Sequence, residues 1–249
     1  MIIPASKDST DAALILPGLT DSSLASTAHF DLDALKNTPL DLFNSQGLIG
    51  SSSLNVISQS ADLSGCLNWP KGRLVNSIPG EWRIGLEKGR ATGVRVTSME
   101  KMQGEDSTRL VADVLNSATH LTDASATFHG IPFFVRKAYR FQTPVISAIA
   151  AEIVRKINEE ANPREEHMLL LAERQAGGAD YRIAFHTRSA GVEESLETSD
   201  IVAAFTLVKS GQLVVVLTFD YEDGGKFGLL ERISTNEWRL VWKSAYTGC

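Results

Sequence analysis

Hydrophobic and polar residues alternate with a period of two along most of the second half of the chain. Such alternation is typical of strands that bury one face. Turn sequences such as Ser210-Gly211 and Thr235-Asn236 separate the later segments at intervals of about twelve residues. The pattern therefore indicates an antiparallel meander. The predicted strands span residues 132–141, 168–174, 181–188, 201–208, 213–221, 227–233 and 238–244.

Two other segments place their apolar residues at helical spacing. The first begins at a cap residue, Asp106 or Ser107, and ends near Leu121. The second follows Thr143-Pro144 and is stopped by Asn162-Pro163. Its apolar stripe predicts a helix over residues 145–157. The stripe consists of Val145, Ile146, Ile149, Ile153 and Ile157.

Few helices among many strands predict an α+β fold, an antiparallel β-sheet meander with two main helices. A chemically distinct segment precedes it, because residues 1–66 contain twelve serines and seven aspartates but no arginine or glutamate. Five of the six net negative charges of the chain lie in this segment. We expect a Ser/Asp-rich arm or small β-rich unit over residues 1–79, followed by the α+β domain over residues 80–249.

The charge and the apolar runs exclude several classes of protein. A net charge of −6 argues against nucleic-acid binding, which needs a basic surface. No uninterrupted apolar run approaches the ~18 residues that cross a bilayer, so we expect no membrane span. Phosphate-binding loops, dinucleotide fingerprints and common hydrolase motifs are absent from the sequence, which predicts no cofactor.

The two cysteines, Cys66 and Cys249, are 183 positions apart, and each follows a glycine. A disulfide between them would tie the end of the chain to the end of the Ser/Asp-rich segment. Disulfides persist in oxidising compartments. This predicts an extracytoplasmic protein, periplasmic or secreted, whose export signal has been removed; a cytoplasmic location is the alternative.

The candidate ligand site is a cationic strand face. With a period of two, Arg182, His186 and Arg188 point to one side of the strand over residues 181–188. Two guanidinium groups can clamp a carboxylate or phosphate, and a histidine between them adds a pH-dependent charge. A solvated face of a half-buried strand explains the same pattern.

Four weaker patterns also have ordinary structural explanations. They are a Ser-x-x-Lys match at Ser98 and Lys101, possible metal ligands at His120, Asp123 and His129, an aromatic and basic strand over residues 133–141, and the pair Trp238 and Trp242. Their spacing is too common to assign a site, and we predict no metal.

The sequence therefore predicts a non-catalytic extracytoplasmic binding or assembly module whose partner is a small anion, a sugar or an envelope protein. The alternative is a hydrolase that uses His129 or His186 with carboxylates brought together by the fold, because a site can form from remote segments. Whether the chain is an enzyme is left open.

Overall fold

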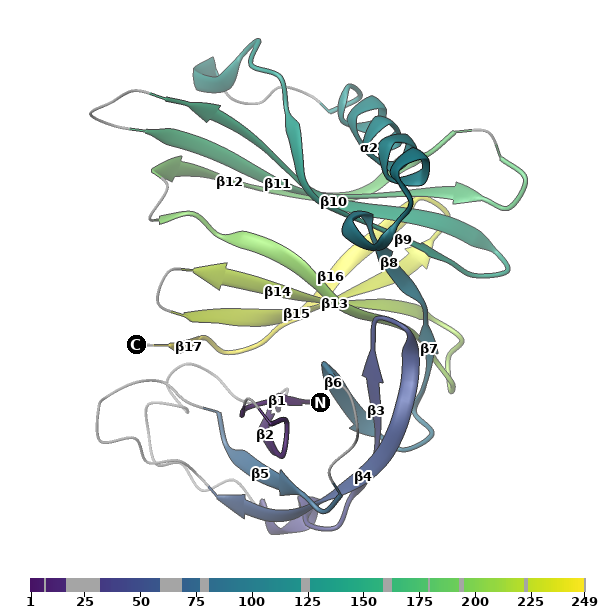
Figure 1. Ribbon diagram of the computed structural model, residues 1–249, viewed down its shortest axis with the longest axis vertical. Helices are drawn as coiled ribbons and strands as arrows, with labels where there is room; N and C mark the ends of the chain where they lie inside the picture. The colour runs from purple at the N-terminus through teal and green to yellow at the C-terminus, as the bar shows by residue number, and fades with distance from the viewer. Residues whose placement is uncertain are drawn as a thin grey trace.

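The computed structural model describes residues 1–6, 8–16, 32–58, 69–76, 81–121, 126–158, 163–178, 180–192, 195–221 and 224–248. Strands dominate these parts of the chain, which hold a single α-helix, α2 (Gly104–Ala118). The predicted α+β fold with two main helices is therefore wrong. The elements stack in four layers, from the top of Figure 1 to the bottom: α2, a five-stranded sheet, a second sheet and a closed barrel.

The barrel is the N-terminal layer. Its six strands pair antiparallel in the order β1-β2-β5-β4-β3-β6 and close where Ile2 meets Gly85. Residues 1–66 supply β1 to β4, and β5 and β6 come from later in the chain. Inward side chains such as Leu42, Leu54 and Trp82 fill the interior. The bounds are β1 (Ile2–Pro4), β2 (Asp11–Leu14), β3 (Pro39–Asn44), β4 (Gly47–Ser58), β5 (Lys71–Leu74) and β6 (Ile84–Glu87).

The sheet next to α2, here called the helix-side sheet, has the order β12-β11-β10-β9-β8. Leu110 and Val114 of α2 pack on its outer face, against Ile149, Ile153 and Met168. The strands are β8 (Val96–Ser98), β9 (Phe134–Gln142), β10 (Ile146–Ile157), β11 (Arg164–Gln175) and β12 (Arg182–Val192).

The segment predicted as the second helix is strand β10 in the centre of this sheet. Ile149 and Ile153 pack beneath α2, whereas Ala148 and Ala150 face the second sheet. A strand buried on both faces reads as a nearly continuous apolar run, and periodicity alone does not separate such a run from a buried helix. The many β-branched residues of β10 favour the extended form.

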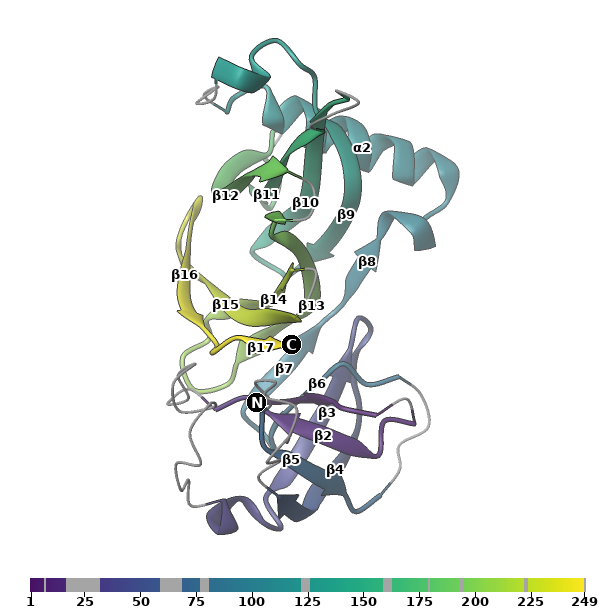
Figure 2. The ribbon, with the colours of Figure 1, turned by 90° about the vertical axis from the view of Figure 1, so that its left-hand side faces the viewer.

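The other sheet, here called the barrel-side sheet, lies between the helix-side sheet and the barrel (Figure 2). It has the order β16-β15-β14-β13-β7, with β17 added beside β15. The strands are β7 (Ala91–Val94), β13 (Thr198–Leu207), β14 (Leu213–Tyr221), β15 (Gly224–Ser234), β16 (Glu237–Lys243) and β17 (Thr247–Gly248). Short 3-10 turns occur at η1 (Asp33–Leu35), η2 (Met99–Lys101) and η3 (Ala126–Phe128).

The chain passes through three layers between β6 and β8. A turn at Lys88-Gly89-Arg90 joins β6 to β7, but these two strands do not pair with each other as a hairpin. Instead β6 pairs with β3 in the barrel, and β7 pairs with β13. One residue later, β8 joins the helix-side sheet by pairing with β9. The strands β7 and β8 therefore connect the two sheets and the barrel.

Apolar side chains hold each pair of layers together. Between the two sheets, Phe141, Leu171 and Leu217 belong to one buried cluster. Between the barrel-side sheet and the barrel, Phe43 packs with Phe205. No helix within the described ranges is long and apolar enough to cross a membrane.

Candidate functional site

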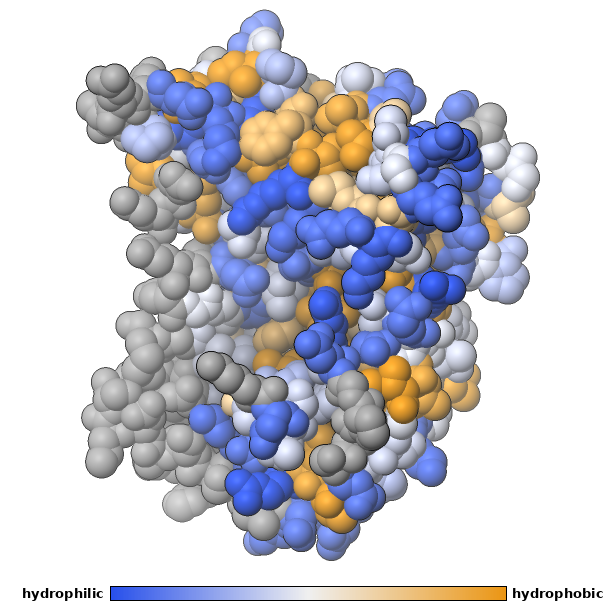
Figure 3. Space-filling model, in the orientation of Figure 1, coloured by the Kyte–Doolittle hydropathy of each residue, from blue (hydrophilic) through white to orange (hydrophobic). Residues whose placement is uncertain are grey.

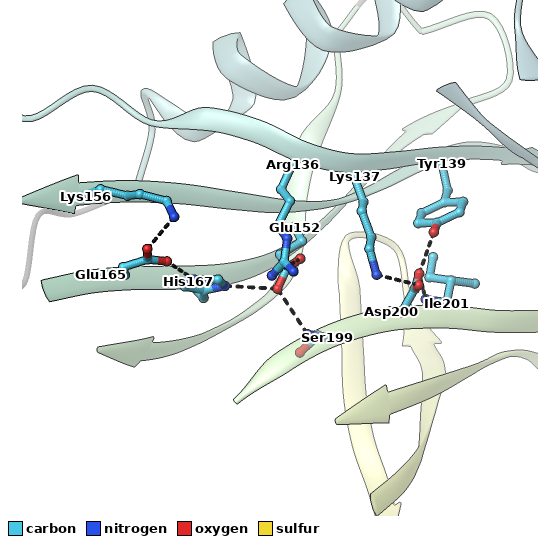
Figure 4. A network of polar contacts seen from close by, with 10 residues as sticks. All are labelled: Arg136, Lys137, Tyr139, Glu152, Lys156, Glu165, His167, Ser199, Asp200 and Ile201. Carbon is cyan, nitrogen blue, oxygen red and sulfur yellow. Dashed lines mark hydrogen bonds and ion pairs between the residues drawn. The ribbon is translucent and has the colours of Figure 1, made fainter. Parts of the chain in front are cut away.

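A β-bulge in β9 turns two neighbouring basic side chains toward the gap between the two sheets. Lys137 pairs with Glu152 of β10. The next pair joins Val135 to Ile153, so Arg136 is an extra residue in its strand. A bulge shifts the alternation of side chains by one position. Arg136 and Lys137 therefore both reach into the gap, as Figure 4 shows.

The first half of β13 is a sheet edge that carboxylates cover. β7 pairs only with the second half of β13. In the first half, the backbone N–H of Ser199 donates to Oε1 of Glu152 at 3.2 Å. The N–H of Ile201 donates to Oδ1 of Asp200 at 2.7 Å. The acids satisfy backbone donors that a neighbouring strand would otherwise satisfy.

Asp200 also binds two side chains from β9. The ammonium group of Lys137 lies 2.7 Å from Oδ2, and the Tyr139 hydroxyl donates to Oδ1 at 2.5 Å. Burial, followed by the hydrogen bond to Asp200, raises the pKa of Tyr139, so the phenol keeps its proton at neutral pH. These contacts fix the three side chains in one arrangement between the sheets.

The polar side chains drawn in Figure 4 extend in a line, here called the polar row, from Lys156 at one end to Tyr139 at the other. His167 of β11 lies between two carboxylates near the Lys156 end of this row. Its Nδ1 is 3.1 Å from Glu152 Oε1, and its Nε2 is 2.7 Å from Glu165 Oε2. Lys156 forms an ion pair with the same Glu165. Burial alone would lower the pKa of His167, but the hydrogen bonds with both acids outweigh burial and raise the pKa above 6.5. The imidazolium form donates from both ring nitrogens.

A pocket of about 220 Å³ lies beside Lys137, Tyr139 and Asp200. We call it the junction pocket, because the barrel and both sheets line it. On the face in Figure 3, hydrophilic residues form a band across the middle of the molecule. The lining consists of Ser45, Arg83, Val96, Ser98, Met99, Glu100, Lys101, Lys137, Ala138, Tyr139, Asp200, Ile201 and Val202.

The junction pocket contains both ends of the Ser-x-x-Lys match. Ser98 ends β8, and Lys101 ends the short turn η2. This stretch brings a hydroxyl group and a cation to the pocket. With Arg83 and Lys137, three cations line the pocket against the two acids Glu100 and Asp200.

The residues predicted to bind a ligand do not share one face of β12. Arg182 pairs with Glu173, whereas His186 pairs with Leu170. Ala184 is an extra residue between these pairs, so a bulge reverses the alternation. Arg182 lies on the side of the barrel-side sheet, and His186 lies on the side of α2. The clamp of two arginines is therefore split between the faces.

Arg188 shares the outer face with His186, where it meets a buried acid. Its Nε lies 3.3 Å from Oε1 of Glu166, which Arg155 also binds. Arg155 in turn donates to the carbonyl of Phe128 at 2.7 Å. This cluster fixes the segment around η3 on the sheet, which is a structural contribution of Arg188.

The tryptophan pair is also split by a bulge. Val241 is the extra residue, so Trp238 faces the core between the sheets. Trp242 packs on the other side, near Trp69. Trp238 donates its indole N–H to Glu173 Oε2 at 2.9 Å. The aromatic and basic strand 133–141 places Phe133 beneath α2 and Phe141 between the sheets.

Some predicted residues lie outside the described parts of the chain. Cys66 and Cys249 are both among them, and so is Asp123. Its proposed partners His120 and His129 are exposed. Among the described residues, no group of three His, Cys, Asp or Glu side chains is arranged to hold a metal ion.

Sequence reasoning missed the central residues of this row: Glu152, His167 and Asp200. The helix predicted over residues 145–157 has an apolar stripe that does not include Glu152, so it gave no reason to expect this side chain in a buried position. In β10 the same glutamate is 2% exposed. A buried charge is costly unless it is paired, so an acid inside an apolar strand indicates cations nearby. Three acidic residues close to His167, at positions 165, 166 and 173, carried part of this signal.

Comparison of the chain with models of known protein families, with curated proteins and with solved structures finds no match. Functional inference for this chain therefore depends on the chemistry of the polar row and the pockets beside it.

Proposed function

We propose that the chain is a non-catalytic binding module and that the junction pocket binds a small polar anion. The observation that carries the proposal is that two cations in the pocket lining are not held in ion pairs. Arg83 and Lys101 line the pocket, and neither forms an ion pair with another described residue. Lys137, by contrast, is already bound to Asp200. Glu100 is the remaining acid of the described lining, so Arg83 and Lys101 leave one net positive charge, which favours an anionic ligand.

The remaining lining supports a polar ligand held in a fixed position. Tyr139 and Lys137 are immobilised by Asp200, so they lose little further conformational freedom when a ligand binds. Ser45 and Ser98 add hydroxyl groups on the barrel and β8 sides. Pockets between structural units are common ligand sites. Small carboxylates and inorganic phosphate have the charge and the size for about 220 Å³.

The alternative predicted from the sequence is a hydrolase that uses His129 or His186. The fold instead places His167 between two carboxylates, and the state of this histidine supports binding over a histidine/carboxylate hydrolase. A general base needs a ring nitrogen that can accept a proton. Both ring nitrogens of His167 lie within hydrogen-bond distance of carboxylates, and its pKa is raised after burial is offset by those contacts. The imidazolium of His167 therefore links Glu152 of β10 to Glu165 of β11 and has no free ring nitrogen to act as a general base.

An extracytoplasmic location is part of the proposal and rests on Cys66 and Cys249 alone. Thiol counting on unfolded, unreduced protein tests it. We expect no reactive thiol and a single bridged peptide pair by mass mapping. Two reactive thiols would contradict the disulfide and remove the argument for export.

Calorimetric titration tests the ligand. The probes are succinate, inorganic phosphate and glucose, and the variants are Arg83→Gln and Lys101→Gln. We expect one of the two anions to bind and each variant to weaken it about tenfold, or about 1.4 kcal/mol. Lys209→Gln is the matched control, because it removes one exposed cation outside the pocket. Glucose binding alone, no binding by either anion, or equal weakening by Lys209→Gln would contradict the proposal.

A further inference from the structure

A second cavity, of about 250 Å³, lies at the His167 end of the polar row. We call it the end pocket. It shares no lining residue with the junction pocket. Figure 4 shows the separation, since Lys156, Glu165 and His167 lie at one end of the row and Tyr139 lies at the other. The two cavities can therefore be tested independently.

Positive charge predominates in the end pocket. Among the described residues, the lining has three basic side chains, Arg136, Lys156 and His167, and one acid, Glu165. His167 contributes a cation because Glu152 and Glu165 both accept hydrogen bonds from its ring. Lys156 forms an ion pair with Glu165, and Arg136 lies 3.4 Å from Glu152. Three cations against these two acids leave one net positive charge beside the cavity.

Arg136 is the cation best placed to bind a ligand. It lies 3.4 Å from Oε2 of Glu152, and that oxygen has no hydrogen-bond partner among the described residues. The Glu152 side chain is only 1% exposed, so a buried carboxylate oxygen faces the arginine without a hydrogen bond. The Arg136 side chain is 44% exposed. Its planar fork of N–H donors matches a carboxylate in two-point geometry.

The rest of the end pocket is apolar. Phe134 lies next to the bulge and is 45% exposed, while Val154 and Leu196 are buried. An exposed aromatic ring beside buried aliphatic groups can cover an apolar ligand body and remove its surface from water. Cations and apolar groups thus line the same small cavity.

We infer that the end pocket is a second binding site, for a small organic carboxylate with an apolar body. The carboxylate binds Arg136, with Lys156 and His167 adding to the positive field. The apolar body packs on Phe134 and Leu196. This site is separate from the anion site of the junction pocket, and its ligand differs in needing apolar surface.

Titration with benzoate, followed by backbone amide shifts in NMR spectra, tests this inference. We expect benzoate to bind with a Kd of about 1 mM or tighter. Benzamide has the same shape without the charge, and inorganic phosphate has charge without the apolar body. Both should bind the end pocket at least about tenfold more weakly than benzoate. The shifts should centre on the amides of Phe134, Arg136 and Thr198.

Paired variants separate the end pocket from the rest of the molecule. Arg136→Gln and Phe134→Ala should each weaken benzoate about tenfold. Arg140→Gln removes a cation from the opposite face of the same strand, and Lys209→Gln removes an exposed cation outside both pockets; both should leave benzoate affinity unchanged. Circular dichroism checks that each variant is folded. No benzoate binding at about 10 mM, equal binding of benzamide or phosphate, or an unchanged affinity in Arg136→Gln would overturn the inference.

Discussion

Gly93 of β7 and Gly47 at the start of β4 lie so close that a Cβ added to Gly93 would come within 2.7 Å of the Gly47 Cα. Nearby, the N–H of Val96 donates to the carbonyl of Ser45 at 2.8 Å. Ser45 and Val96 both line the junction pocket. The backbone contact between barrel and sheet therefore sets the spacing of that pocket.

Gly93→Val should disturb both stability and ligand binding. Its side chain must displace backbone atoms, so we expect a loss of about 1–3 kcal/mol in the free energy of unfolding. The affinity of the junction pocket for succinate or phosphate should fall as well. Urea unfolding and calorimetry measure the two effects. Gly104→Ala is the control, since a Cβ there meets nothing within 4 Å. An unchanged stability of Gly93→Val would disprove the close contact.

His167 should make stability depend on pH in the neutral range. Its folded pKa is raised, because the hydrogen bonds of Glu152 and Glu165 outweigh the effect of burial. The stabilisation is fully present below the unfolded value near 6.5 and is lost as the pH rises through the folded pKa. We expect the stability advantage of wild type over His167→Gln to shrink over that window.

Urea unfolding at a series of pH values measures this difference. The charged groups that face His167 are Glu152, Glu165, Arg136 and Lys156. An advantage that stays constant or grows as the pH rises would show that His167 is neutral in the folded protein.

Glu173 joins the two sheets through hydrogen bonds from Arg232, Asn236 and Trp238, and its removal should be strongly destabilising. Arg232 donates at 2.8 and 3.0 Å, the backbone N–H of Asn236 at 2.5 Å and the Trp238 indole at 2.9 Å. Glu173→Leu leaves a cation and an indole N–H without a partner, so we expect a loss of about 3–5 kcal/mol. The exposed Glu237→Gln should cost less than about 0.5 kcal/mol. Chemical denaturation of both variants measures these losses in the free energy of unfolding. Equal losses for Glu173→Leu and Glu237→Gln would contradict the role of Glu173 in joining the sheets.

The same glutamate should contribute to acid unfolding. Burial would raise the pKa of Glu173, but hydrogen bonds from Arg232, Asn236 and Trp238 outweigh it and lower the pKa below 4.5. Its stabilisation is present above 4.5 and is lost as the pH falls through the folded pKa. Glu173→Gln should therefore lose less stability than wild type between neutral and acidic pH.

Two substitutions in β10 separate a strand from the helix that the sequence pattern predicts. In a helix, Val145 and Ile149 lie on one apolar face, so truncation of either side chain costs stability. In the structure Ile149 is 1% exposed and Val145 is 58% exposed. We expect Ile149→Ala to cost about 2–5 kcal/mol. Val145→Ala should stay within about 0.5 kcal/mol, and comparable losses in urea unfolding would favour the helix.

Local patterns predicted the elements that depend on local chemistry. β14 spans the predicted residues 213–221, and α2 carries the predicted apolar stripe. The turn at Asn236 adopts φ 56°, a conformation that Asn tolerates well. The sequence did not predict β10, because its two buried faces depend on layers supplied by distant parts of the chain.

Bulges account for most errors about side-chain faces. An extra residue at Arg136, Ala184 or Val241 reverses every later side chain in its strand. The prediction that Arg182, His186 and Arg188 share one face depends on an unbroken period of two. The pairing of Trp238 with Trp242 on one face depends on the same period. Nothing in the local sequence marks these bulges with a glycine. The pairing of strands across the sheet determines their positions.

Amide shift mapping during titrations with succinate and with inorganic phosphate measures whether the junction pocket binds a small polar anion. We expect one of the two anions to give saturable shifts at Ser98, Lys101 and Val202, and Arg83→Gln to need about tenfold more of that anion for the same shifts. Shifts centred on Arg182 and His186, or none at any residue, would contradict anion binding at the junction pocket.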